Sequence, residues 1–195
     1  MDNARAALYT QITRLRRVWR VSGLRFEAFC IARSLPGVKV RETRFSTPAF
    51  RGILVTAPDK SKAIIVLNSL RSEEEQTFDL THELVHFELH PPTMDSQKYS
   101  QFYEWQANEG AAELLMPRAT VLEDMYVCRK AIGDPKNQRG YISARADHFG
   151  VTQALFERRL FVLRYDIRQA LSGIPPEEIP ILPQSWYSKN KNCKP

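Results

Sequence analysis

Two histidines and a glutamate stand close together in the stretch HELVH, residues 82–86. On a helix, side chains four residues apart share one face about one turn apart, so His82 and His86 can reach the same metal ion. Neutral imidazole nitrogens bind zinc, and a catalytic zinc site combines three protein ligands with a water. Glu83 is then free to act on that water as a general base. The pattern predicts a hydrolytic zinc site with Glu83 as its catalytic residue.

A third protein ligand has to come from another part of the chain. The segment EWQANEGAAELLMP, residues 104–117, carries three glutamates. Glu104 is followed by three alanines, and small residues allow one helix to approach another closely. Glu113 stands beside the apolar LLM and is a rival inward-pointing carboxylate, whereas Glu109 is expected to be solvated. Spacing alone leaves Glu104 and Glu113 open as the third ligand.

The other two histidines and two nearby tyrosines are weaker candidates. His90 follows His82 by eight residues, or about 12 Å along a helix axis, which is too far for both to bind one ion. It is expected at the helix C-terminus, where a partial positive charge suits the helix dipole. His148, Tyr99 and Tyr103 are expected to be packing or surface residues rather than groups that stabilise a reaction intermediate.

The elements that position these residues follow from hydrophobic patterning and turn signals. Strands are expected at 38–42, 51–57 and 62–68, the last two as a hairpin. Ser72 and Glu75 form a capping-box pattern at the start of the HELVH helix. The expected fold is α+β, a small, mostly antiparallel three-stranded sheet packed on that helix, with a helical C-terminal part. Further helices are expected at 3–20, 25–34, 97–116, 118–131, 142–150 and 151–171, with a loop at 133–140.

The order of these elements suggests four parts. They are an N-terminal helical segment (1–36), a metallopeptidase core (37–132), a helix-turn-helix-like segment (133–172) and a Pro-rich basic tail (173–195). In the third part, Gly150 provides the turn, and Arg158 and Arg159 could touch phosphate. The second helix is nevertheless rich in Leu and Phe rather than base-reading polar residues, so direct DNA binding is not expected.

Composition indicates which partners and which cellular compartment to expect for the protein. The chain has 195 residues, 43% of them hydrophobic, and a net charge of +6, which permits an acidic partner but does not require one. Its three cysteines form no CxxC pair, which is typical of reduced thiols. The sequence shows neither a transmembrane-length apolar run nor a signal-peptide pattern. We therefore expect a cytoplasmic protein without membrane contact.

The paired segments FDLTHELVHFELH (78–90) and EWQANEGAAELLMP (104–117) resemble the ImmA/IrrE family of zinc metallopeptidases over about residues 38–165. The resemblance implies zinc, or alternatively manganese, bound by His82, His86 and Glu104, with Glu113 structural. Thr81 and Gln106 depart from the common pattern, in which Ala and Glu are frequent, but neither change removes a ligand.

The resemblance also implies a biological role. Family members cleave a helix-turn-helix repressor and thereby induce phage, mobile-element or stress genes. The expected partner is therefore a repressor protein as substrate. The alternative is a regulator that keeps the fold without hydrolysis and binds a repressor, or binds DNA through residues 144–164.

Overall fold

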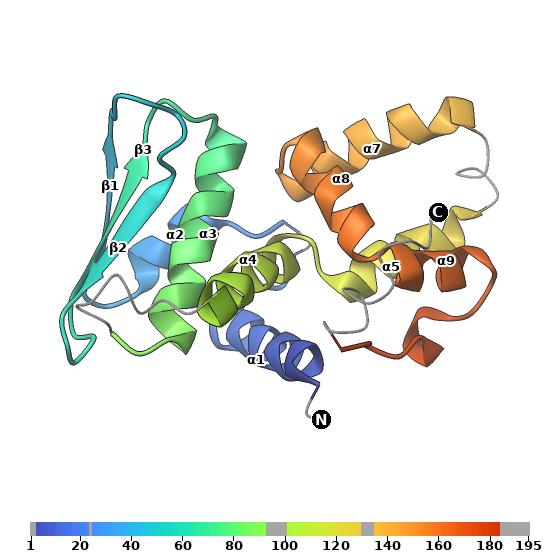
Figure 1. The fold of residues 1–195 in the computed structure, drawn as a ribbon, viewed down its shortest axis with the longest axis horizontal. Helices are drawn as coiled ribbons and strands as arrows, with labels where there is room; N and C mark the ends of the chain where they lie inside the picture. The colour runs from blue at the N-terminus through green and yellow to red at the C-terminus, as the bar shows by residue number, and fades with distance from the viewer. Residues whose placement is uncertain (1–2, 24, 93–100, 130–134, 184–195) are drawn as a thin grey trace. The chain divides into compact units, whose positions relative to one another are not determined.

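The computed structural model describes residues 3–23, 25–92, 101–129 and 135–183 (Figure 1). The chain forms two compact units, one of Arg25–Leu115 and one of Met1–Leu24 together with Met116–Pro195. The α+β class expected from the sequence is confirmed. The four-part division of the chain stays a prediction.

The first unit contains a mixed sheet of β1 (Val38–Thr43), β2 (Gly52–Thr56) and β3 (Ala63–Asn68) in the order β1-β3-β2. The expected hairpin is confirmed, because β2 and β3 are antiparallel. The expectation of a mostly antiparallel sheet is wrong, because β1 pairs with β3 in parallel. The physical reason is that β3 is the most apolar strand and its inward residues are buried, so it takes the centre of the sheet and leaves β1 and β2 as edges. With β3 in the centre, β1 pairs with β3 instead of with β2, and this pairing is parallel.

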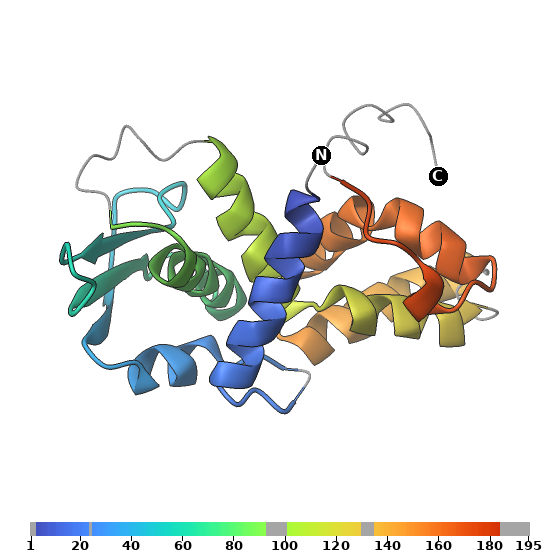
Figure 2. The same cartoon turned by 90° about the horizontal axis from the view of Figure 1, so that it is seen from below.

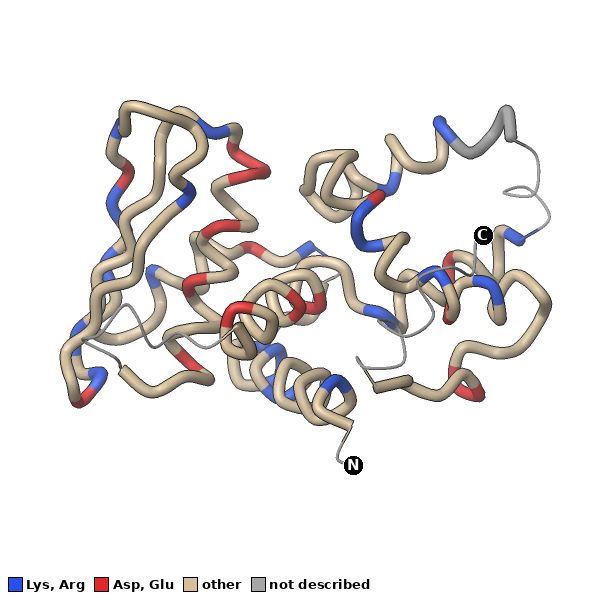
Figure 3. Tube along the Cα trace, viewed as in Figure 1, with Lys and Arg blue, Asp and Glu red and all other residues tan. Residues whose placement is uncertain are grey.

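Helix α3 (Glu73–Leu89) carries HELVH and begins with the expected capping box. The Ser72 hydroxyl accepts from the Glu75 backbone N–H at 3.2 Å, and the Glu75 carboxylate accepts from the Ser72 N–H at 3.0 Å. Three glutamates in the first turn, seen as red in Figure 3, suit the positive end of the helix dipole. The helix ends at Leu89, with His90 as its C-cap. Its start and end therefore follow directly from local sequence.

Helix α3 lies between the sheet and helix α4 (Gln101–Leu115), as Figures 1 and 2 show. It packs on β2 and β3, on α4 and on the short helix α2 (Ala28–Ser34). In α4, Ala107, Gly110 and Ala111 are buried. These small residues allow the axis of α4 to come close to a neighbouring helix.

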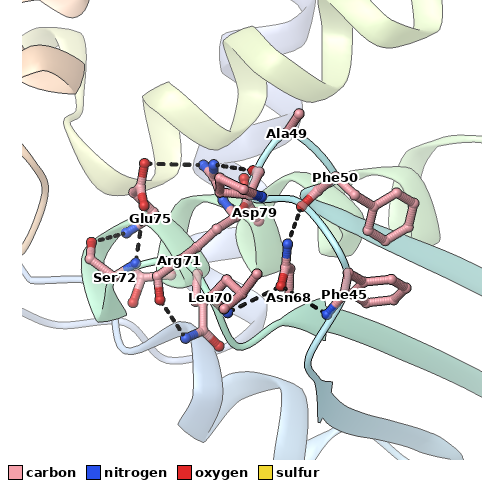
Figure 4. A network of polar contacts seen from close by, with 12 residues as sticks. Phe45, Ala49, Phe50, Asn68, Leu70, Arg71, Ser72, Glu75 and Asp79 are labelled. Atoms are coloured by element: carbon pink, nitrogen blue, oxygen red, sulfur yellow. Dashed lines mark hydrogen bonds and ion pairs between the residues drawn. The ribbon is translucent and has the colours of Figure 1, made fainter.

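A polar network ties the end of β3 to the loop before β2 (Figure 4). The buried Asn68 amide donates to the carbonyls of Thr47 and Phe50 at 2.8 and 2.7 Å. Its oxygen accepts from the Leu70 N–H at 3.1 Å. Next along the chain, Arg71 binds Asp79 of α3 at 2.5 Å. The network therefore fixes both the approach to β2 and the first turns of α3.

The second unit is helical in the residues that the structure describes. It contains α1 (Ala4–Val18), α5 (Arg118–Val127), α7 (Pro135–Phe149), α8 (Gln153–Val162), α9 (Arg164–Leu171) and the short 3₁₀ helix η2 (Pro176–Glu178). The expectation of a loop at 133–140 is wrong from Pro135 onward, where α7 begins. Proline is accommodated in the first turn of a helix, so Pro135 does not prevent a helix from starting there. The single helix expected at 151–171 is divided at Leu163. No described helix is long and apolar enough to span a membrane.

The turn between α7 and α8 has the predicted form. Gly150 has a positive φ of 66°, and the Thr152 hydroxyl caps α8 by accepting from the Leu155 N–H at 3.2 Å. Arg159, however, is only 2% exposed. Its guanidinium donates to the Met116 carbonyl at 3.1 Å and to the Tyr9 hydroxyl at 3.3 Å. Arg159 is therefore a structural residue and is not free to contact a phosphate.

We expect Asn68→Ala to lower the free energy of unfolding by about 2–4 kcal/mol, because the buried Asn68 amide loses its hydrogen bonds to the Thr47 and Phe50 carbonyls and to the Leu70 N–H. Urea denaturation followed by circular dichroism measures the change. Thr47→Ala is the matched control: it removes only an exposed hydrogen bond in the same loop. We expect it to cost less than about 1 kcal/mol. Equal losses in the two variants would contradict this role for Asn68.

Candidate functional site

A cavity of about 340 Å³ lies in the first unit, between one face of α3, the start of α4 and strand β2. Its lining contains both histidines of HELVH, Glu83 and Glu104. The fold thus brings the two sequence segments that could do chemistry to one place. The complete lining is Arg51, Gly52, Ile53, Leu54, Asp79, His82, Glu83, His86, Glu104 and Asn108.

The three predicted ligands converge in this cavity. The Nε2 atoms of His82 and His86 are 3.0 Å apart. The Glu104 carboxylate faces both rings, with one oxygen 3.6 Å from His82 Nε2 and the other 3.3 Å from His86 Nε2. With one oxygen taken from Glu104, all three ligand atoms lie within 4.8 Å of one another.

These distances fit a metal centre. Bonds of about 2.0–2.2 Å in a tetrahedral site put neighbouring ligand atoms roughly 3.3–3.6 Å apart. The separations of 3.0, 3.3 and 3.6 Å are close to that edge length. Two imidazoles and one carboxylate also form a ligand set found in catalytic zinc sites. The arrangement can therefore hold a divalent cation.

The protonation of the two histidines favours metal binding as well. Burial lowers the pKa of His82 to about 4, with Arg51 and His90 adding to the effect. Burial likewise lowers the pKa of His86 to about 3, helped by His82 and His90. Both rings are thus neutral at pH 7 and offer a nitrogen lone pair. A metal ion has no proton to displace from either Nε2 ligand atom when the ring carries its proton on Nδ1.

Glu83 lies beside these ligands on α3 and is not part of the converging set. Burial, together with the neighbouring Glu104 and Asp79 carboxylates, raises its pKa to about 8. A side chain that exchanges a proton near neutral pH suits general acid–base chemistry. A bound cation would favour the ionised form of Glu83 and so offset the cost of its burial.

Asp79, Arg51 and Gly52 are among the lining residues that sequence reasoning missed. Asp79 lies four residues before Glu83 on α3, and extending the HELVH face back by one turn would have found it. Arg51 and Gly52 come from the start of β2, where no motif marks them. A Cβ on Gly52 would lie 3.1 Å from the Val66 carbonyl and 3.7 Å from a Glu83 oxygen. Gly52 therefore places bare backbone next to Glu83.

The rival carboxylates lie elsewhere on α4. Glu113 is buried but is not in the cavity lining. Glu104 is the carboxylate that joins the two histidines among the residues the structure describes. The expectation that Glu109 is solvated is wrong, since it is 8% exposed. Glu109 is thus one of the buried residues of α4, together with Ala107 and Gly110.

The remaining histidines and tyrosines named as weaker candidates lie outside the cavity lining or outside the described residues. His90 is at the end of α3 as expected, and burial lowers its pKa, which disfavours the partial positive charge expected there. Tyr103 stacks on the His90 ring with centroids 4.6 Å apart, which confirms a packing role. Tyr99 lies outside the described residues. His148 belongs to α7 in the second unit and makes an edge contact with Phe149.

We expect Glu83→Gln to stabilise the metal-free protein increasingly as the pH rises from about 5 to 8. The folded pKa of Glu83 is raised above its ordinary 4.5 to about 8. In that range unfolding releases a proton, so the wild type loses stability with rising pH, whereas glutamine has no such loss. At about 1.4 kcal/mol per pKa unit, the difference reaches a few kcal/mol at pH 8.

Urea denaturation in the presence of a chelator at pH 5, 6, 7 and 8 measures this effect. Glu73→Gln, an exposed change in the first turn of the same helix, is the control and should follow the wild-type profile. If Glu83→Gln also follows the wild-type profile, Glu83 is not buried as an acid in the metal-free protein.

Comparison with known proteins agrees with the geometry. A family model for Peptidase M78, described as the IrrE N-terminal-like domain, matches residues 33–161. The match includes the sheet, α3 and α4. An "Uncharacterized immunity region protein 2" of Bacillus phage phi105 is 42% identical over 65 residues, covering 30% of this chain and 41% of the relative. The match thus spans less than half the length of that relative. Since the family model covers well over half of the chain, including every residue of the cavity, the chain belongs to the Peptidase M78 family with its IrrE N-terminal-like domain.

Proposed function

We propose that the protein is a zinc-dependent endopeptidase, with manganese as the alternative metal. The observation that carries this proposal is the convergence of His82, His86 and Glu104 beside Glu83 in one cavity. Membership in a peptidase family supports it independently. His82, His86 and Glu104 are assigned as ligands and Glu83 as the catalytic residue.

The roles of the side chains follow from their positions. Zinc held by His82, His86 and Glu104 would acidify a water molecule and polarise a peptide carbonyl. Glu83 accepts a proton from the attacking water and delivers it to the leaving amine. Burial and the nearby Asp79 and Glu104 carboxylates make Glu83 a better proton acceptor than an exposed glutamate would be. Its position outside the ligand set leaves both carboxylate oxygens for this work.

Strand β2 offers a place for an extended peptide. It is an edge strand, paired only with β3 among the described strands, and Gly52, Ile53 and Leu54 line the cavity. An edge strand presents backbone N–H and C=O groups that an added strand can pair with. A peptide bound along β2 would pass the bare backbone of Gly52, next to Glu83. This arrangement supports a protein substrate cut within its chain.

The substrate we propose is a helix-turn-helix repressor, whose cleavage derepresses phage, mobile-element or stress genes. The family resemblance supports it, and so does the relative whose name assigns it to a phage immunity region. The alternative, binding of DNA through residues 144–164, is less well supported, because Arg159 is buried and bound to other protein groups.

We expect Glu104→Ala to lose metal, whereas Glu113→Gln keeps it. Each variant is purified, equilibrated with zinc and analysed for bound metal by mass spectrometry of the element. Glu113 is the matched control, because it is a glutamate on the same helix but outside the cavity. Circular dichroism shows whether each variant is folded. Zinc kept by Glu104→Ala and lost by Glu113→Gln would reverse the ligand assignment.

We expect Glu83→Gln to bind zinc like the wild type and to cleave at least about 100-fold more slowly, because it cannot accept a proton. The protein is incubated with zinc or manganese and a purified repressor encoded by a neighbouring gene. Mass spectrometry then identifies the cut. Glu73→Gln, exposed on the same helix, should cleave normally. Undiminished cleavage by Glu83→Gln would refute the mechanism, and repressor binding without cleavage by the wild type would favour the non-hydrolytic alternative.

A further inference from the structure

The second ring nitrogen of His86 points away from the ligand cluster and contacts another histidine. His86 Nδ1 lies 2.8 Å from His90 Nδ1. On the far side of the second ring, His90 Nε2 lies 3.2 Å from the side-chain oxygen of Gln106. The three side chains thus form a chain of contacts that starts at a proposed ligand and ends on α4.

Only one arrangement of protons satisfies this chain when His86 binds a metal through Nε2. The Nε2 atom must then offer its lone pair, so the ring proton of neutral His86 is on Nδ1. His86 Nδ1–H donates to His90 Nδ1, which has to accept. The proton of neutral His90 is therefore on Nε2, where it donates to the Gln106 oxygen. Donor and acceptor alternate without conflict along the chain.

The surroundings hold His90 in place for this role. The ring is only 2% exposed and stacks on Tyr103 at an interplanar angle of 27°. Its backbone N–H donates to the His86 carbonyl at 3.1 Å. Tyr103 and Gln106 are three residues apart on α4 and flank the proposed ligand Glu104 in sequence. One turn of α4 therefore supplies both a ligand and the support for His90.

The Nδ1 atom of the other proposed histidine ligand lacks such support. His82 Nδ1 is buried and has no hydrogen-bond partner within the part of the chain that the structure describes. The two imidazoles thus differ, although they are equivalent in the HExxH motif. A hydrogen bond to the second nitrogen of a metal-binding histidine fixes its tautomer and ring orientation, and losing it typically costs 10–100-fold in metal affinity.

We propose that His90 and Gln106 form a positioning relay that holds His86 in the tautomer and orientation needed to bind the metal. This inference rests on the proposed function, because it takes His86 to be a ligand. His90 is a positioning residue and does not touch the metal. The neutral amide of Gln106 completes the relay without adding a charge.

Nitrogen-15 NMR of the histidine rings in the zinc-loaded protein tests the relay directly. We expect His86 to carry its proton on Nδ1 and His90 to carry its proton on Nε2, with His90 Nδ1 unprotonated. A packing role for His90 makes no demand on its tautomer. A proton on His90 Nδ1 would overturn the relay, and this measurement needs no variant.

Zinc affinity, measured by competition with a chelating dye, provides the second test. His90→Phe keeps an aromatic ring against Tyr103 but cannot accept from His86, so we expect zinc to bind about 10–100-fold more weakly. Gln106→Leu should weaken binding to a smaller extent, whereas Gln106→Glu, which still accepts from His90, should bind at least as tightly as the wild type. Affinity of His90→Phe within about threefold of wild type would overturn the proposal.

The proposed function and the His90–Gln106 relay can fail separately in these experiments. If the wild type binds no divalent ion, or binds it without His86, the proposed function fails. If wild type binds zinc through His82, His86 and Glu104 while His90→Phe binds it equally well, only the relay fails. If Gln106→Glu weakens binding as much as His90→Phe does, Gln106 is not the acceptor that the relay requires.

Discussion

The close approach of α4 to α3 is the constraint on which the site depends. HELVH supplies two imidazoles from one helix face, but a third ligand can reach them only if the second helix has no bulky side chains at the contact. Ala107, Gly110 and Ala111 are small and buried on α4, which packs against α3. The same turn of α4 that places Glu104 also carries Tyr103 and Gln106 to His90. One helix–helix contact thus sets both the proposed ligand geometry and its support.

Around that contact, the fold gathers groups that are costly to bury. Burial lowers the pKa of both histidines and raises the pKa of Glu83 and Asp79. Without a cation, Glu83 reduces the stability of the folded state at neutral pH. The capping box, the Asn68 network and the Arg71 contact to Asp79 help to offset this cost by fixing the flanks of α3. A divalent ion would relieve the repulsion among the carboxylates and use the free imidazole lone pairs.

Local signals predicted much of this structure. The capping box predicted the start of α3, the two prolines after His90 predicted its end, and the turn before β3 predicted the hairpin. The parallel pairing of β1 depends on which strand takes the centre, so it is a tertiary property that local patterns did not reveal. The loop-like composition of residues 133–140 did not indicate the helix that begins at Pro135.

The surroundings of the site were harder to predict than the convergence of His82, His86 and Glu104. Arg51 and Gly52 reach the cavity only because β2 is an edge strand beside α3. The eight-residue spacing between His82 and His90 predicts that His90 is not a ligand. The same spacing does not indicate a contact with His86, one turn away, or with a partner on a different helix. Sequence spacing identifies residues that can meet on one helix, whereas supporting contacts between helices require the packed structure.

Anomalous diffraction at the zinc absorption edge, from crystals of the zinc-loaded protein, tests the proposed metal centre. We expect an anomalous peak bound by Nε2 of His82, Nε2 of His86 and a carboxylate oxygen of Glu104, with Glu83 close by but not bound. A peak bound by Glu113 or His90 in place of any of these ligands, or no peak in this cavity, would contradict the proposed metal centre.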